Sequence, residues 1–255
     1  MPRPLARVAD LLERLGLSAV AFDLYQRGKA LVAPAAPGLP PPYLRVLTAG
    51  TTHPVIYAGV GGNSAREVVA LARRHGVALD AGEAVLDFGC GCGRIAGPMA
   101  ITVPAALHGC DVNDQLIEWC RANLPGAYRL TGAEPPLPYA AGTFTLVYAL
   151  SVFTHLHEAN ASAWLAELAR VTRPGGLAVF SLFDEATPAA APFRDALLAR
   201  GYVVRREGPE GTNLLCGYFS RAGFAERAAP AWRALEFVDS ADSATGQTLA
   251  VLRRT

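Results

Sequence analysis

The chain has 255 residues, enough for one large α/β domain with additions or for two small domains. Hydrophobic residues make up 51% of it and charged residues 18%, which allows a substantial core and argues against a chain that is disordered throughout. Lys and Arg number 23 against 22 Asp and Glu, so no excess of positive charge is available to follow a nucleic acid or an anionic membrane surface.

Membrane and secretion signals are not recognisable. No apolar run approaches the roughly eighteen residues of a membrane span, and charges interrupt the apolar residues near the start before a signal-peptide core can form. We therefore expect a cytoplasmic protein whose five cysteines are thiols, with no nucleic-acid or membrane partner. Cys90 and Cys92 stand as C-x-C without partners at zinc-like separations, so no metal site is expected. Nothing in the sequence indicates an oligomeric state.

The first part of the chain predicts helices around a proline-rich connector. Apolar residues recur at helical spacing in two pieces within residues 5–30. The prolines of residues 33–42 predict an extended connector. Residues 43–62 have a mixed pattern in which the glycines of 59–62 are a loop signal, and residues 64–75 predict a helix that leads into the core.

A strand followed directly by a glycine-rich turn stands at the centre of the chain. Residues 84–88 predict a short buried strand that contains Asp87, and three glycines then alternate along the turn. Glycine permits positive φ angles and a close ligand approach that a Cβ would prevent. Residues 94–102 can form a helix whose N-terminal N–H groups point back toward the turn. The three glycines are Gly89, Gly91 and Gly93.

Strands and helices alternate along the remainder of the chain. Residues 106–110 predict a second strand that Asp111 closes, and Asn113 can cap the helix that follows. This alternation predicts an α/β fold with a doubly wound, mostly parallel sheet. The further expected elements are the helices 114–123, 158–171 and 189–201, the strands 127–131, 143–150, 177–183, 202–206 and 213–218, and the last strands 235–238 and 248–253.

The D-x-G-x-G-x-G arrangement of Asp87 and the three glycines resembles the first motif of the class I S-adenosylmethionine (SAM)-dependent methyltransferases. Later motifs are similar in order and spacing, namely L-P-Y with G-T-F-T-L-V at 137–147, S-V-F-T-H-L at 151–156, as in one large bacterial branch, and an R-P-G-G turn at 173–176. The resemblance covers residues 84–183. Its motifs are far more specific together than any one of them alone.

The resemblance implies a Rossmann-like methyltransferase fold with a seven-stranded sheet whose last two strands form an antiparallel edge. Residues 1–75 are then the N-terminal helical segment and cover, and residues 76–255 are the SAM-binding domain. The segment at about 184–230 looks like an insertion that shapes the substrate site.

The resemblance also implies the cofactor, SAM with S-adenosylhomocysteine (SAH) as its product, and the residues that bind it. In the family the glycine turn packs against the methionine part, and an acid that closes the next strand holds the ribose diol, because a carboxylate can accept hydrogen bonds from both hydroxyls. That acid is Asp111 here. Ala133 stands where the family often has an acid for the adenine, so the nearby backbone is expected to take this role. The implied cofactor-binding residues are Asp87, Gly89, Gly91, Gly93, Asp111, Val112, Gly132, Ala133, Glu134 and Leu150.

The glycines permit a second interpretation, a dinucleotide site with the G-x-G-x-x-G/A pattern. The pattern fails from Gly89, because its third position is Arg94, and it is met formally from Gly91, where that position is Ala96. Asp87 favours the methyltransferase, since an acid at the end of the first strand would repel a pyrophosphate but can serve the ammonium of a bound amino acid.

His155 is the candidate catalytic base. It follows the fourth strand, where a parallel sheet opens its ligand crevice, and a usual pKa of about 6.5 suits proton removal near neutrality. Its alternative role is capping or packing at the start of the next helix. We expect a SAM-dependent methyltransferase that acts on an O or N nucleophile of a small molecule. The alternatives are an NAD(P)-dependent oxidoreductase and a methyltransferase-like binding module without turnover.

Overall fold

The structure is a computed structural model that describes residues 28, 30, 31, 33 and 35–255. The helices expected within residues 5–30 therefore lie outside the described residues, apart from their last positions. The chain divides into two compact units, Met1–Tyr57 and Ala58–Thr255, and the division falls within the long helix α4 (Pro54–Arg74).

In the first unit, the described residues centre on the short helix α3 (Pro42–Ala49), which ends at Gly50 in a left-handed conformation with φ of 65°. The guanidinium of Arg45 donates hydrogen bonds to the carbonyl of Pro40 (3.0 Å) and to that of Thr52 (3.1 and 2.7 Å). One side chain thus ties the segment that enters the helix to the segment that leaves it.

The prediction of a loop at residues 59–62 is wrong, because α4 runs through these glycines without interruption. Pro54 at the first helical position suits a helix start, since its missing N–H has no partner there in any case. A Cβ on Gly61 would lie 2.3 Å from the carbonyl oxygen of Arg94. Glycine at this position therefore serves the close approach of two segments, and not a break in the helix.

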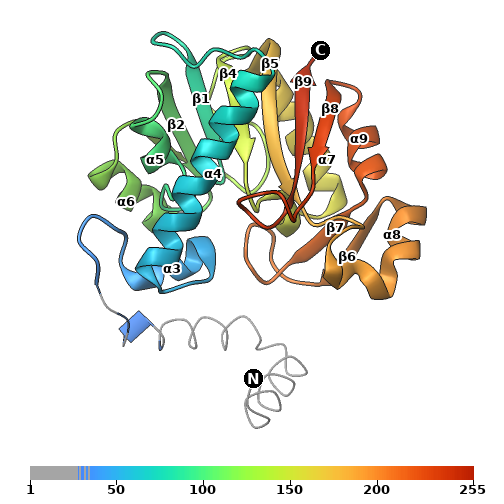
Figure 1. The fold of residues 1–255 in the computed structure, drawn as a ribbon, viewed down its shortest axis with the longest axis horizontal. Helices are drawn as coiled ribbons and strands as arrows, with labels where there is room; N and C mark the ends of the chain where they lie inside the picture. The colour runs from blue at the N-terminus through green and yellow to red at the C-terminus, as the bar shows by residue number, and fades with distance from the viewer. Residues whose placement is uncertain (1–27, 29, 32, 34) are drawn as a thin grey trace. The chain divides into compact units, whose positions relative to one another are not determined.

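A mostly parallel sheet of seven strands forms the second unit, in the order β3-β2-β1-β4-β5-β9-β8 (Figure 1). Strands β1 to β5 pair in parallel, and β9 pairs antiparallel with both β5 and β8. The expected doubly wound seven-stranded sheet is confirmed. Its strands are β1 (Ala84–Phe88), β2 (Ala106–Asp111), β3 (Ala127–Leu130), β4 (Phe144–Ala149), β5 (Thr172–Leu182), β8 (Trp232–Val238) and β9 (Thr248–Arg254).

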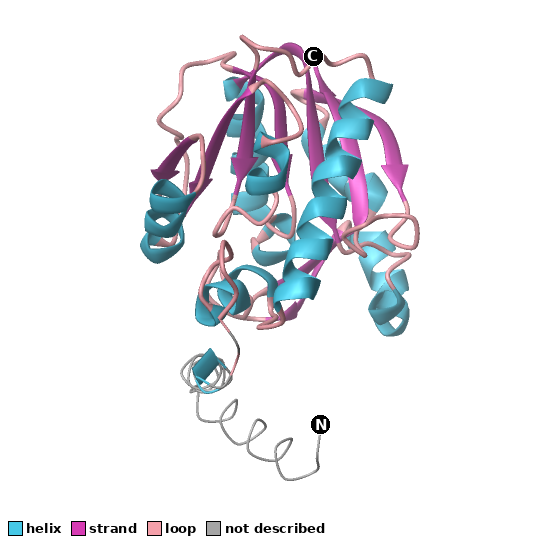
Figure 2. Cartoon of the chain, turned by 60° about the vertical axis from the view of Figure 1, so that its left-hand side comes forward, coloured by secondary structure: helices cyan, strands magenta, loops and turns pink. Residues whose placement is uncertain are grey.

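Helices cover both faces of this sheet, as Figure 2 shows. Alternate residues of a strand point to opposite faces, so Leu146 and Tyr148 of β4 enter one core while Val147 and Ala149 enter the other. The continuous apolar run of β4 is thus explained by burial on both sides. One face carries α4, α5 (Ala96–Ala100) and α6 (Asp114–Asn123), and the other carries α7 (Glu158–Val171) and α9 (Arg221–Ala228).

Local signals placed several helix ends correctly, and two expectations need correction. Asn113 caps α6 as predicted, because its side chain accepts hydrogen bonds from the backbone N–H groups of Gln115 and Leu116. The turn expected at 173–176 belongs to β5 instead. Pairing between β4 and β5 jumps across these residues, so the strand absorbs them as a bulge. The helix expected at 189–201 is a 3₁₀ turn (Pro188–Phe193) followed by α8 (Arg194–Arg200).

Between β5 and α9 the chain leaves the main sheet and forms a small one of its own. Strands β6 (Tyr202–Arg206) and β7 (Cys216–Phe219) pair as an antiparallel hairpin beside α8, at the lower right of Figure 1. Helix α9, which the sequence analysis did not predict, begins after Ser220, whose side chain caps it by accepting from the N–H of Gly223. Within the described residues, no helix has the length and hydropathy that crossing a bilayer requires.

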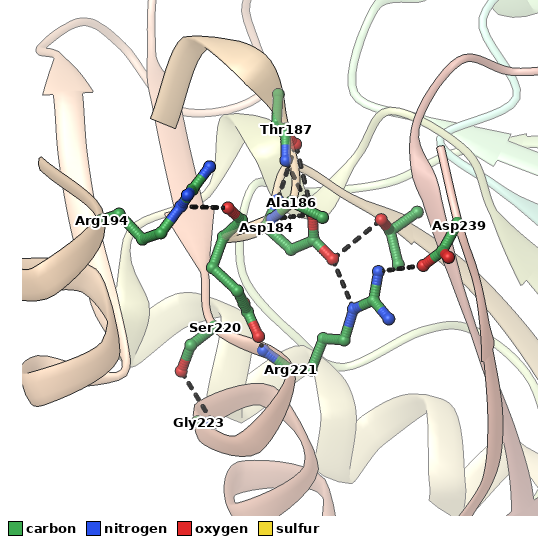
Figure 3. A network of polar contacts seen from close by, with 10 residues as sticks. Asp184, Ala186, Thr187, Arg194, Ser220, Arg221, Gly223 and Asp239 are labelled. Carbon is green, nitrogen blue, oxygen red and sulfur yellow. Dashed lines mark hydrogen bonds and ion pairs between the residues drawn. The ribbon is translucent and has the colours of Figure 1, made fainter. Parts of the chain in front are cut away.

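A buried ion pair joins the two ends of this excursion, where the chain leaves the main sheet after β5 and where α9 begins (Figure 3). Asp184, fully buried just after β5, accepts hydrogen bonds from Arg221 Nε (2.6 Å) and from the hydroxyl of Thr248 at the start of β9 (2.8 Å). The same guanidinium reaches Asp239 Oδ1 through Nη2 at 2.5 Å. The first and last residues of the excursion are therefore held together and to the main sheet.

Candidate active site

Strand β1 leads directly into a turn whose glycines, Gly89, Gly91 and Gly93, have φ angles of 71°, 56° and 70°. The N–H of Gly89 donates to the carbonyl of Cys110 at the end of β2 (2.8 Å), which fastens the turn to the neighbouring strand. A Cβ on Gly89 would lie 2.4 Å from Val152 Cγ2, so packing as well as backbone conformation requires glycine there.

Asp111 joins the end of β2 to the glycine turn. Its carboxylate accepts hydrogen bonds from the N–H of Gly91 (2.8 Å) and the N–H of Asn113 (2.9 Å). A carboxylate offers about four acceptor positions, so capacity for further donors remains. Burial raises the pKa of Asp111, while these backbone donors oppose the shift.

Asp87 provides a second carboxylate beside that of Asp111, and it is buried, with only 3% of its surface exposed. Burial raises its pKa to about 7; Tyr148 and Arg94 oppose the increase, and the negative charge of Asp111 adds to it. The Tyr148 hydroxyl lowers the pKa of Asp87, yet neither this hydroxyl nor Asp87 Oδ2 makes a well-formed hydrogen bond among the described residues. A positively charged ligand would stabilise the ionised form of both aspartates.

The loop after β3 reaches the same edge of the sheet. Gly132, Ala133 and Glu134 are exposed there, and the N–H of Thr131 donates to the backbone carbonyl of Asp111 (3.0 Å). The carbonyl of Ala133 accepts hydrogen bonds from Asn160 Nδ2 (3.0 Å) and from Trp164 Nε1 (3.1 Å), both on α7. Val112 is 44% exposed, whereas Leu150 is buried at the end of β4.

His155 ends the 3₁₀ turn Phe153–His155, just beyond β4. Its Nδ1 lies 2.7 Å from the backbone carbonyl of Leu215. A carbonyl can only accept, so Nδ1 carries the hydrogen and the lone pair of the neutral ring is on Nε2. Burial lowers the pKa of His155, and the charge of Arg206 lowers it further against the opposing effect of the Leu215 hydrogen bond. The ring is therefore neutral at physiological pH.

The structure brings Asp87, the glycine turn and Asp111 into one connected group at the carboxyl ends of β1 and β2. His155 lies beyond β4 and is held instead by the excursion after β5. No local pattern in the sequence indicates a role for Val152, which packs on Gly89. The turn that places Val152 begins at Ser151, a non-glycine residue with φ of 61°, and such a residue carries no recognisable turn signal.

The strand order and the reversed β9 are those of the Rossmann-like methyltransferase fold. A structure of a SAM-dependent methyltransferase from Methanosarcina mazei matches with a TM-score of 0.56 and 15% identity over 71% of this chain and 96% of that one. The geranyl diphosphate C-methyltransferase of Streptomyces coelicolor, in complex with Mg²⁺, geranyl diphosphate and SAH, matches with a TM-score of 0.54 and 13% identity over 74% and 80%. These likenesses establish the fold.

The sequence is also similar to methyltransferases. Residues 85–176 match the family model described as a methyltransferase domain. A phthiotriol/phenolphthiotriol dimycocerosates methyltransferase of Mycobacterium ulcerans is 35% identical over 39% of this chain and 37% of its own length. A ubiquinone biosynthesis O-methyltransferase of Thiobacillus denitrificans is 28% identical over 58% and 63%. The chain thus spans less than two thirds of the length of these relatives.

Proposed function

We propose that this protein is a SAM-dependent methyltransferase that transfers a methyl group to an O or N nucleophile of a small molecule. The observation that carries the proposal is the bond from the Gly91 N–H to Asp111, because it joins a side-chain-free turn and a carboxylate at the ends of neighbouring strands. The methyltransferase family model, matched over residues 85–176, supports the same chemistry.

The residues present fit this cofactor. SAM carries a ribose diol, an ammonium and a positively charged sulfur. Asp111 retains acceptor capacity for a diol, and the unsatisfied Oδ2 of buried Asp87 suits an ammonium. The raised pKa values of both aspartates fit a site in which the ligand supplies positive charge. When bound, SAM supplies an activated methyl group.

This chain's own residues then position the acceptor and remove its proton. Bringing the nucleophile into line with the methyl group is the larger task. His155 has the protonation state for the second task, because Nδ1 donates to Leu215 and Nε2 can accept a proton from an O–H or N–H group.

Calorimetry separates this function from its alternatives. We expect the purified protein to bind SAM and SAH with micromolar or tighter affinity and to show no heat of binding with NAD or NADP. An NAD(P)-dependent oxidoreductase would give the reverse result. A binding module without turnover would bind SAH but transfer no label from methyl-labelled SAM to any component of a metabolite extract.

Replacing His155 with Gln is expected to lower methyl transfer by about 10²- to 10⁴-fold and leave the affinity for SAH within about twofold. The loss follows because glutamine cannot take up the acceptor's proton. Because the pKa of His155 is lowered, the rate of the parent enzyme should fall on the acidic side only below about pH 6.5, the usual pKa of histidine. Labelled transfer measured against pH tests this, with His157→Gln as the control on the neighbouring, more exposed histidine. Unchanged transfer would remove His155 from the mechanism.

We propose that residues 76–255 form the SAM-binding domain and that the insertion at about 184–230 shapes the acceptor site. We also propose that the protein works in the cytoplasm, where the thiols of its five cysteines would stay reduced. The bacterial relatives support a bacterial origin. The S-V-F-T-H-L motif at 151–156 is the ground on which we propose the branch.

A further inference from the structure

The loop that joins β6 and β7, residues 207–215, has a well-defined shape. A Cβ on Gly208 would lie 2.7 Å from Leu214, so the two sides of the loop touch. Within the loop, the Thr212 hydroxyl donates to the carbonyl of Pro209 (2.7 Å), and Leu215 is fully buried at its end. The loop therefore has internal order and an apolar anchor.

This loop holds His155 from two sides. The N–H of Gly211 donates to the backbone carbonyl of His155 (3.0 Å), and the His155 ring donates through Nδ1 to the carbonyl of Leu215 (2.7 Å). Nearby, the Tyr202 hydroxyl donates to the carbonyl of Leu156 (2.9 Å). The orientation of the His155 ring thus depends on a loop about sixty residues further along the chain.

Glu210 attaches the middle of this loop to the start of α7. One carboxylate oxygen accepts from the N–H of His157, and the other accepts from Asn160 Nδ2 at 2.8 Å. His157 occupies the N-cap position, yet its side chain makes no capping hydrogen bond, so Glu210 supplies an acceptor from outside the helix. A negative charge at a helix N-terminus is favourable. Asn160 also donates to Ala133, which links the anchor to the loop after β3.

We propose that Glu210 is a positioning residue that fastens the loop 207–215 to α7, so that the Leu215 carbonyl selects the Nδ1–H form of His155 and keeps the lone pair on Nε2. The inference rests on the proposed role of His155 as the proton acceptor. Glu210 acts through its contacts with α7 and is not itself required to touch a reacting atom.

The tautomer of His155 can be observed directly in the full chain without any ligand. Protein labelled with ¹⁵N at its five histidines gives long-range ¹H–¹⁵N spectra, and the His155→Gln variant identifies the His155 signals by their loss. We expect a protonated Nδ1 and an unprotonated Nε2 in the parent. In Glu210→Ala the two nitrogen shifts should move toward the averaged values of a freely exchanging imidazole. Glu210→Gln, which keeps an acceptor toward His157, should retain the parent's pattern.

Glu207 provides the matched control. It lies in the same loop, is exposed, and approaches His157 Nε2 only at 3.7 Å. Glu207→Ala should leave the His155 spectrum unchanged, and a thermal melt of each variant shows that the fold persists. A parent with the hydrogen on Nε2, a Glu210→Ala spectrum identical to the parent's, or an equal change in Glu207→Ala would each overturn the inference. Because this readout needs no turnover, its failure is distinct from failure of the proposed methyl transfer.

Discussion

Replacing Asp111 with Ala is expected to lower the affinity for SAM and SAH by about 100-fold or more. Two hydrogen bonds from a diol to a charged acceptor contribute about 1.5–3 kcal/mol each, and about 1.4 kcal/mol corresponds to a tenfold change. The substitution also leaves the N–H of Gly91 without its carboxylate partner, so the turn loses one of the hydrogen bonds that hold it to β2. Both losses weaken the binding of SAM and SAH.

Titration calorimetry with SAH measures this effect, and two variants separate its causes. Asp111→Asn keeps one carbonyl oxygen that can hold the Gly91 N–H but removes the charge, so its affinity should lie between those of the parent and Asp111→Ala. Asp114→Asn removes a carboxylate three residues away on the exposed start of α6, and its affinity should stay within about twofold of the parent's. Unchanged affinity in Asp111→Ala would refute the proposed cofactor site.

We expect the replacement of Asp184 to lower the stability of the fold strongly. Asp184→Ala should lower the free energy of unfolding by about 3–5 kcal/mol, the usual cost of removing one partner of a buried ion pair. The change leaves the largely covered guanidinium of Arg221 without its buried carboxylate partner and leaves the Thr248 hydroxyl without its acceptor. It also opens the neck through which the chain leaves and rejoins the main sheet (Figure 3).

Asp239 is the matched control, because it binds the other side of the same guanidinium but is 58% exposed. Asp239→Ala should cost only about 0–1 kcal/mol, since water and salt screen an exposed pair. Urea denaturation followed by circular dichroism gives both values. Equal losses in the two variants would mean that burial of Asp184 has no special effect on stability.

The elements that the sequence predicted well are those with a strong local pattern. Residues 158–171 form α7 with the expected ends, because their apolar spacing is helical along the whole segment. Strand β4 is a continuous apolar run, and Asn113 caps α6 through its own neighbours. In each case the deciding interactions lie within one element or are common to every buried strand.

Errors arose where a distant contact changes the meaning of a local signal. The glycines of α4 resemble a loop, but Gly61 is needed because the backbone at Arg94 passes close to the helix. The residues 173–176 resemble a turn, yet β5 absorbs them as a bulge against β4. Helix α9 has a weak apolar pattern, and its side chains Phe224 and Ala228 are buried on one side of the helix.

The sequence by itself determined the parallel α/β sheet and the position of the glycine turn and its two aspartates at the ends of neighbouring strands, since these follow from patterns within short segments. Only the tertiary structure decided that Gly91 binds Asp111, that Val152 packs on Gly89, and that Leu215 orients the His155 ring. These pairs are separated by about twenty to sixty residues, and such contacts depend on how complete elements pack, which no local pattern of residues encodes.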